Sequence, residues 1–155
     1  RKMIEDSLDI IMNQDEITLQ EYVKENREQF RTLPTEDVAF PRGVSEVTKY
    51  TVGDTYDKAT PIAVRGAILY NKYRKKGSEP IRNKDKIKFT YLKVPNPIGE
   101  NVIAFPNVLP SELGLHDYVD YDEQFNKAYL SPINIICDKI GWKTEKQSTL
   151  EDFFS

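Results

Sequence analysis

Apolar side chains recur at helical spacing from the first residues of the chain. Met3, Ile4, Leu8 and Ile11 follow one another at intervals of one, three or four residues, as on one face of an α-helix. The polar run after Met12 ends this pattern. Residues 1–13 are therefore predicted to form an amphipathic helix.

A second helix is predicted to begin after Thr18. Glu21, three residues later, completes the spacing of a capping box, and Pro34 ends the pattern. The apolar face of this helix consists of Leu19, Tyr22, Val23 and Phe30. We expect residues 1–33 to form a helical base.

Breaking residues divide the middle of the chain. Pro41 and Gly43 exclude a helix from residues 38–45, which are predicted to be extended, and residues 51–60 are predicted to form a loop. Thr60-Pro61 is typical of a helix start, and Gly77 follows that helix as a candidate C-terminal cap. Glycine inside a helix costs about 1 kcal/mol relative to alanine, so Gly66 indicates that another segment packs closely there.

Strict alternation of apolar and polar residues marks a strand at residues 84–94. Ile87, Phe89 and Tyr91 are predicted to face the core, with Lys86, Lys88 and Thr90 on the opposite face. Residues 102–105 are predicted to return as the second strand of an antiparallel hairpin, after a turn rich in proline and glycine.

Helical spacing returns from Leu109 to Ile140, with a predicted break between two helices at Ser131-Pro132. Gly141 ends the pattern, and residues 143–149 are predicted to form a polar linker. The predicted fold class is α+β: a mostly helical domain with a small antiparallel β-hairpin tip and an extended C-terminal tail.

Composition describes an ordinary polar globular chain. Its 155 residues are 39% hydrophobic and 30% charged, enough for one domain with a core. The sequence has no apolar run of membrane-spanning length and no visible signal peptide. Cys137 lies in an apolar run and is predicted to be a buried thiol. The sequence has one cysteine and one histidine, His116, too few for a metal-binding cluster of these residues.

Charge is distributed unevenly along the chain. The formal net charge is −3, but residues 42–93 hold 13 Lys or Arg and 5 Asp or Glu, a net +8. Residues 1–41 carry a net −5 and residues 94–155 a net −6. A basic middle between acidic flanks predicts a nucleic-acid footprint, although a solvated face with scattered lysines gives the same pattern.

The last residues of the sequence are unusually apolar for a terminus. Gln147, Leu150, Phe153 and Phe154 stand at the spacing of a glutamine, an aliphatic residue and two aromatic residues. This pattern resembles the peptide with which replication proteins bind the ring-shaped sliding clamp. The alternative is a tail that folds back on its own domain.

Several segments together resemble the thumb and C-terminal tail of the family B DNA polymerases of T-even-type phages. The similarity lies in residues 41–50, 61–71, 96–99 and 103–106 and in the tail, none of which is a catalytic signature. It implies a mostly helical thumb, residues 1–142, that holds primer-template duplex behind the polymerising site. Residues 143–155 would then be a linker and clamp-binding peptide. Within the thumb, the implied parts are the helical base 1–33, the DNA-gripping segment and helix 38–76, the β-tip 84–106 and the helices 109–141.

The resemblance also assigns candidate DNA-binding residues. Sequence-independent gripping needs cations and backbone amides at phosphates, and small residues where the backbone approaches DNA. The positions that match are Arg42, Gly43, Lys49, Tyr50, Arg65 and Gly66, with Lys84, Lys86 and Lys88 as additional candidates. Edge lysines also protect strands from aggregation, and Tyr50 is equally typical of a core aromatic residue.

The chain lacks the chemistry of a complete polymerase. Two aspartates of a palm domain hold catalytic magnesium in that family, and Asp54 and Asp57 lack the hydrophobic strand of such a site. We predict no catalytic residue, no metal and no cofactor in this chain. Magnesium is expected in a separate palm.

The resemblance further implies its partners and location. The expected partners are primer-template duplex, a sliding clamp, and the palm and exonuclease portion in the same or another chain. A membrane is not among them. The expected location is the cytoplasm of an infected bacterial host. Because the helical pattern begins at the first residues, we expect a C-terminal piece of a longer polymerase. The alternatives are a free-standing clamp-binding protein and an autonomous duplex-binding module.

Overall fold

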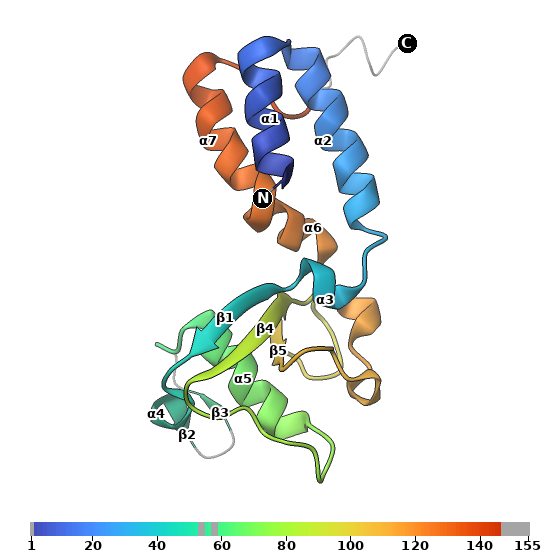
Figure 1. Cartoon of the computed structure of the whole chain (residues 1–155). Coiled ribbons are helices and arrows are strands. Elements are labelled where there is room, and N and C mark those ends of the chain that lie inside the picture. The colour runs from blue at the N-terminus through green and yellow to red at the C-terminus, as the bar shows by residue number, and fades with distance from the viewer. Residues whose placement is uncertain (1, 53–54, 57–58, 147–155) are drawn as a thin grey trace. The chain divides into compact units, whose positions relative to one another are not determined.

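The computed structural model describes residues 2–52, 55–56 and 59–146. The chain divides into two compact units, which we name by their architecture (Figure 1). The helical unit comprises Arg1–Thr32 and Phe125–Ser155, and the sheet unit comprises Leu33–Gln124. Helices predominate and the sheet is small and antiparallel, so the predicted α+β fold class is confirmed.

The helical unit contains α1 (Lys2–Asn13), α2 (Glu16–Phe30) and α7 (Ser131–Ile140). The first helix is where the apolar pattern predicts it. The start of α2 is not, because Asp15 caps it instead of Thr18. The Asp15 carboxylate accepts hydrogen bonds from the Thr18 amide (2.9 Å) and hydroxyl (2.6 Å). Both bonds favour the ionised form and lower the pKa of Asp15.

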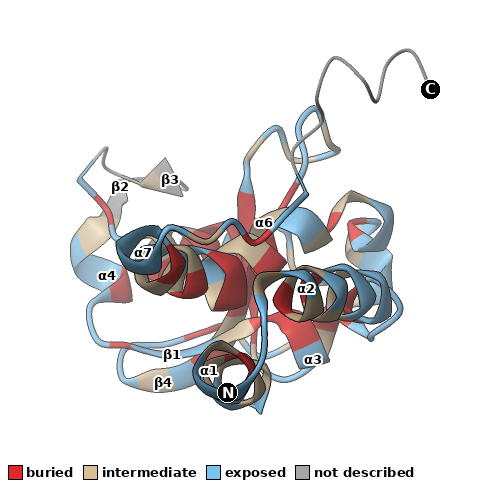
Figure 2. Cartoon of the chain, turned by 90° about the horizontal axis from the view of Figure 1, so that it is seen from above, coloured by how far each residue is buried: buried red, intermediate tan, exposed pale blue. Residues whose placement is uncertain are grey.

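Aromatic side chains form the centre of the helical unit. The Phe125 ring lies 5.3 Å from that of Phe30 and 5.2 Å from that of Tyr129, both in edge-to-face geometry. The buried Tyr129 hydroxyl is hydrogen-bonded to the buried hydroxyl of Ser7 on α1. Buried and exposed residues alternate around α2, as its apolar periodicity predicts (Figure 2).

The predicted helix break at Ser131-Pro132 is wrong. α6 (Tyr121–Phe125) continues into a π-helical turn, η3 (Asn126–Leu130), and then directly into α7. Pro132 lies in the first turn of α7, directly after the π-helical turn. Gly141 ends α7 with φ of 76°, a left-handed conformation that suits glycine.

The sheet unit is built on three antiparallel strands in the order β1-β4-β5. These are β1 (Phe40–Val44), β4 (Asp85–Tyr91) and β5 (Val102–Phe105). The predicted hairpin is thus present as β4 and β5, and the extended segment predicted around Pro41 joins it as an edge strand. An edge position explains why a proline is accommodated there.

The connections of the sheet unit contain short elements. They are α3 (Thr35–Val38), α4 (Val47–Tyr50), a small hairpin of β2 (Thr51–Val52) and β3 (Thr55–Tyr56), η1 (Ser111–Leu113) and η2 (His116–Tyr118). The loop predicted for residues 51–60 therefore contains a paired hairpin. The helix predicted from Leu109 begins only at Tyr121, after two 3₁₀ turns.

α5 (Ile62–Tyr73) packs on the sheet and starts and ends differently from the prediction. Pro61 stands at the N-cap position in place of Thr60, which is buried. The helix ends three residues before Lys76, and Gly77 (φ 95°) forms a turn beyond it. Thr90, predicted to be on the polar face of β4, is also buried.

Residues 143–145 differ from the predicted linker. The Lys143 amide donates to the Glu16 carboxylate (2.8 Å), and the Gln20 side chain donates to the Lys143 carbonyl (3.0 Å). The buried Thr144 donates to Asn134 at 2.8 Å. This segment is consequently part of the helical unit.

Candidate nucleic-acid interface

Strand pairing brings two of the predicted basic segments together. In the register of β1 and β4, Gly43 lies opposite Lys86 and Arg42 lies opposite Ile87. Residues directly opposite each other in an antiparallel pair share a face of the sheet. Lys86 and Gly43 therefore belong to one face, and Arg42 to the other, on the edge strand. A ligand that contacts both cations must meet the β1 edge.

The β1 edge is open to a large ligand. Arg42, Gly43 and Lys86 are exposed, and a Cβ built on Gly43 would have no atom within 4 Å. Lys88 is different, because its ammonium donates to the Glu36 carbonyl at 3.0 Å. Of the strand lysines, Lys86 is thus better placed for an external phosphate than Lys88.

Side-chain hydrogen bonds join α4 to the turn before β4. The Thr48 amide donates to the Asn83 side chain (3.1 Å), whose own amide donates back to the Thr48 hydroxyl (3.3 Å). Each bond sits one residue from a predicted cation, Lys49 or Lys84. Lys84 is exposed and adopts a positive φ of 71°, and its amide donates to the Val44 carbonyl at the end of β1.

Lys49 and Tyr50 have distinct environments. The exposed Lys49 ammonium lies 3.2 Å from the Glu46 carboxylate and 5.3 Å from the Tyr50 ring centroid. The hydrogen bond that Lys49 donates to the Glu46 carboxylate favours the charged ammonium and raises the pKa of Lys49. Tyr50 is half-buried and packs against the core of the sheet unit. Its ring supports Lys49 as well as the core.

Arg65 is held by an aromatic ring. Its guanidinium lies 4.8 Å from the centroid of Tyr56 and 3.4 Å from the carbonyl of Thr60. The Tyr56 hydroxyl donates to the Glu100 carboxylate at 2.6 Å, and burial raises the pKa of that hydroxyl. The Nε atom of Arg65 is buried and has no hydrogen-bond partner among the described residues. Arg65 is therefore restrained while part of its donor capacity is unused.

Gly66 has a packing role. A Cβ at this position would lie 2.9 Å from the Ala104 amide nitrogen and 3.1 Å from the Ile103 carbonyl carbon, both backbone atoms of β5. This is the close approach that a glycine inside a helix indicates. Since β5 fills the space, we leave Gly66 out of the proposed DNA-binding surface.

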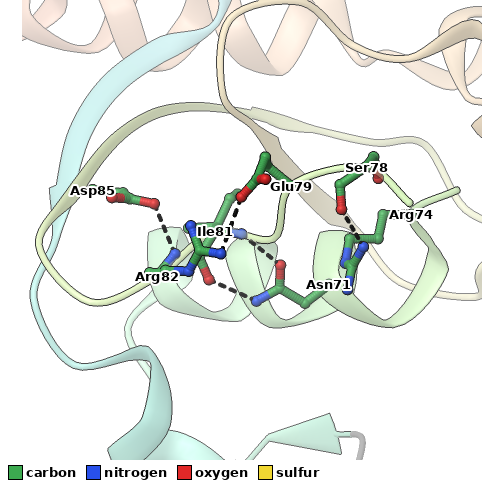
Figure 3. A network of polar contacts seen from close by, with 7 residues as sticks. All are labelled: Asn71, Arg74, Ser78, Glu79, Ile81, Arg82 and Asp85. Atoms are coloured by element: carbon green, nitrogen blue, oxygen red, sulfur yellow. Dashed lines mark hydrogen bonds and ion pairs between the residues drawn. The ribbon is translucent and has the colours of Figure 1, made fainter. Parts of the chain in front are cut away.

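The loop between α5 and β4 is held by polar contacts (Figure 3). Asn71 makes two hydrogen bonds to the backbone of Ile81, accepting from its amide (2.7 Å) and donating to its carbonyl (2.9 Å). The Asp85 carboxylate accepts from the Arg82 amide at 2.8 Å. Arg74 also donates to the Ser78 carbonyl. These contacts fix the direction in which the chain enters β4.

Other predicted site residues lie outside the described residues. These are the clamp-binding candidates Gln147, Leu150, Phe153 and Phe154 and the rejected metal candidates Asp54 and Asp57. Conversely, sequence reasoning missed Tyr56, Asn83 and Glu100 as supports of the cations. The contacts of Asn83 with Thr48 and of Glu100 with Tyr56 join residues 35 and 44 positions apart, so no local pattern marks them. Tyr56 and Arg65 are closer in sequence but belong to different elements, β3 and α5.

The described residues contain neither a metal-binding cluster nor a membrane-spanning helix. Among residues 2–52, 55–56 and 59–146, no group of three His, Cys, Asp or Glu side chains is placed to hold a metal ion. Within the same described ranges, no helix has the length and apolarity of a membrane span.

The chain is similar in sequence to phage DNA polymerases. No protein-family model matches the sequence. The chain is 25% identical over 159 aligned residues to the DNA-directed DNA polymerase of Enterobacteria phage T4, with 99% of the chain covered. It is 26% identical over 132 residues to the DNA-directed DNA polymerase of Escherichia phage RB69, with 81% covered.

These alignments cover little of the relatives. The chain spans 18% of the T4 phage polymerase and 14% of the RB69 phage polymerase. The chain is thus homologous to a limited region of phage DNA polymerases.

Proposed function

We propose that this chain is the thumb-like part of a family B DNA polymerase and holds primer-template duplex without reading its sequence. The observation that carries the proposal is similarity to phage DNA polymerases over 99% of the chain. Arg42, Lys86, Lys49 and Arg65 would supply cations to the phosphates, and Gly43 would admit the DNA backbone. The palm, with its magnesium ions, and the exonuclease would lie outside this chain, and the enzyme would act in the cytoplasm of the infected host.

The proposal includes a tether to a sliding clamp. Leu150, Phe153 and Phe154 would enter an apolar cleft of the clamp, and Gln147 would fix the orientation of the peptide. Burial of each apolar side chain gains roughly 2 kcal/mol before ordering costs, so an affinity of about −8 kcal/mol, micromolar, is reasonable. This suffices because DNA and thumb together raise the effective concentration of the peptide.

Primer extension separates the thumb-like role from an independent activity. Two-metal phosphoryl transfer needs carboxylate ligands, and the isolated 155-residue chain is expected to extend no primer with magnesium and nucleotides. Extension by the pure chain would contradict the proposal.

Product length tests the tether. In an intact polymerase, deletion of residues 147–155 should leave single-nucleotide insertion unchanged and shorten products only when clamp is present. The matched control is Phe153→Ala with Phe154→Ala, which keeps chain length and should shorten products similarly. Equal loss with and without clamp would show that the peptide serves the thumb itself.

A further inference from the structure

Basic residues gather where α5 emerges from the core of the sheet unit. The helix is buried from Gly66 to Tyr70, and the chain then reaches the surface. Residues 72–76, which we call the α5 end cluster, hold four cations and one aromatic ring: Lys72, Tyr73, Arg74, Lys75 and Lys76. All of them except Arg74 are exposed.

The helix dipole explains only part of this cluster. Cations are favourable in the last turn of a helix, and the effect falls off beyond that turn. Because α5 ends at Tyr73, Lys72 lies in its last turn, whereas Lys75 and Lys76 follow the helix. The charges of these two lysines suit an external anion.

The turn that carries these lysines is fixed by hydrogen bonds. The Arg74 guanidinium donates to the Ser78 carbonyl (Figure 3), and the Nε atom of Arg74 is buried. The Ser78 amide and hydroxyl both donate to the Lys75 carbonyl, at 3.0 and 2.6 Å. Glu79, the next acidic residue along the chain, pairs with Arg82 at 3.0 Å. Arg74 thus has a structural role, and the exposed lysines stand on a preformed backbone.

Tyr73 adds a surface on which a base can stack. The residue is 39% exposed, and the Lys72 ammonium lies 5.2 Å from the centroid of its ring. An aromatic ring beside cations suits single-stranded nucleic acid, because bases stack on the ring while phosphates pair with the cations. Bases inside a duplex are stacked on each other, so an exposed ring favours an unpaired strand.

We propose that the α5 end cluster binds single-stranded DNA: Tyr73 stacks on an unpaired base, and the three lysines pair with phosphates. Lys72 follows Arg65 by seven residues, nearly two turns, so it lies on the same side of α5 about 10 Å along the axis. The cluster therefore continues the proposed duplex-holding surface toward a strand that leaves the duplex. The choice of DNA as the anion rests on the proposed function, and the stacking on unpaired bases goes beyond it.

Fluorescence anisotropy of the full 155-residue chain tests the stacking. Labelled oligothymidylate of about 12 nucleotides should bind more tightly than an abasic strand of equal length. Tyr73→Ala should weaken oligothymidylate binding about tenfold and leave abasic binding unchanged, because only stacking is lost. Tyr73→Phe keeps the ring and should bind like the unchanged chain. The control is Val108→Ala, at a position of the sheet unit that is 56% exposed, and it should have no effect.

Salt dependence tests the lysines. Single-stranded binding has a slope of about −0.7 per neutralised phosphate on logarithmic axes. Replacing Lys75 and Lys76 together by alanine should therefore make the slope shallower by about 1.4. The matched control replaces Lys93 and Lys139, two exposed lysines outside the cluster, by alanine. It changes the net charge equally and should preserve the slope.

Three results would overturn the proposal. They are equal binding of the abasic strand and oligothymidylate, unchanged oligothymidylate affinity in Tyr73→Ala, and displacement by oligoglutamate as effective as by unlabelled oligothymidylate. The last result would identify an acidic peptide as the partner. A hairpin duplex measured in parallel reports on the proposed function separately. If the unchanged chain binds no duplex but binds oligothymidylate through Tyr73, the cluster is supported and the duplex-holding role is contradicted.

Discussion

The helical unit and the sheet unit differ in how the sequence determines their structure: local periodicity in the first, pairing of distant segments in the second. The helical unit follows local apolar periodicity, and its aromatic centre is reinforced by one buried hydroxyl pair, Ser7 and Tyr129. The sheet unit depends on pairing between β1 and β4, 40 or more residues apart. The candidate cations for DNA lie in the sheet unit, where pairing and not periodicity positions them.

This difference predicts where single substitutions act most strongly. In the sheet unit, the buried side chain of Gln124 links distant segments by hydrogen bonds, and Gly66 allows α5 and β5 to pack closely. In the helical unit, most polar side chains lie at the surface and side-chain packing dominates. The following variants rank these contributions from the largest expected effect to the smallest.

Gln124→Met is expected to have the largest effect on stability. Gln124 is fully buried, accepts from the Tyr91 amide (2.9 Å) and donates to the Val38 carbonyl (2.8 Å). Methionine can make neither hydrogen bond in this buried position, a loss of about 4 kcal/mol in total. Urea unfolding measures the loss. The matched control is Gln29→Met at an exposed position of α2, and equal losses would contradict the role of Gln124.

Gly66→Val should cost the sheet unit about 3 kcal/mol, because the added atoms collide with the backbone of β5. Gly43→Val places the same side chain in open space on β1 and should change the free energy of unfolding by less than about 0.5 kcal/mol. Thermal unfolding of the two variants gives the comparison. A tolerated valine at position 66 would show that α5 packs less closely than described.

Tyr129→Phe should destabilise the helical unit by about 1.5 kcal/mol, since the buried Ser7 hydroxyl loses its partner. Tyr22→Phe removes a hydrogen bond of 2.9 Å to Asp6 in a partly exposed position. Water replaces that bond, so a loss of only about 0.5 kcal/mol is expected. Chemical denaturation of both variants is the measurement, and a reversed order would contradict the assignment of Tyr129 as the buried support.

Local patterns predict much of the fold. The periodicity of residues 1–13 corresponds to α1. The alternation of residues 84–94 corresponds to β4, which ends earlier, at Tyr91. Local patterns fail to predict helix boundaries where other contacts determine them. Asp15, and not Thr18, is the N-cap of α2. A π-helical turn precedes Ser131, and the helix continues through Pro132.

The candidate site is predictable only in part for the same reason. The basic residues can be recognised in the sequence by their charge, but the residues that hold them in place cannot. Tyr56 under Arg65 and Asn83 beside Thr48 act through contacts that depend on the fold. Gly66 illustrates the converse, because its unusual position in a helix is visible in the sequence whereas its partner, β5, is not.

Salt-dependent binding of duplex DNA is the most direct measurement of the proposed role. With about four phosphates neutralised, the logarithm of the binding constant should fall with the logarithm of salt concentration at a slope of about −3 to −4, equally for unrelated sequences. Charge reversal at Arg42, Lys49 and Arg65 of the sheet unit should nearly abolish binding. Reversal at Lys2, Lys24 and Lys139 of the helical unit is the matched control and should preserve the slope. Binding that survives the first triple variant, or that does not change with salt, would contradict a duplex-holding surface on the sheet unit.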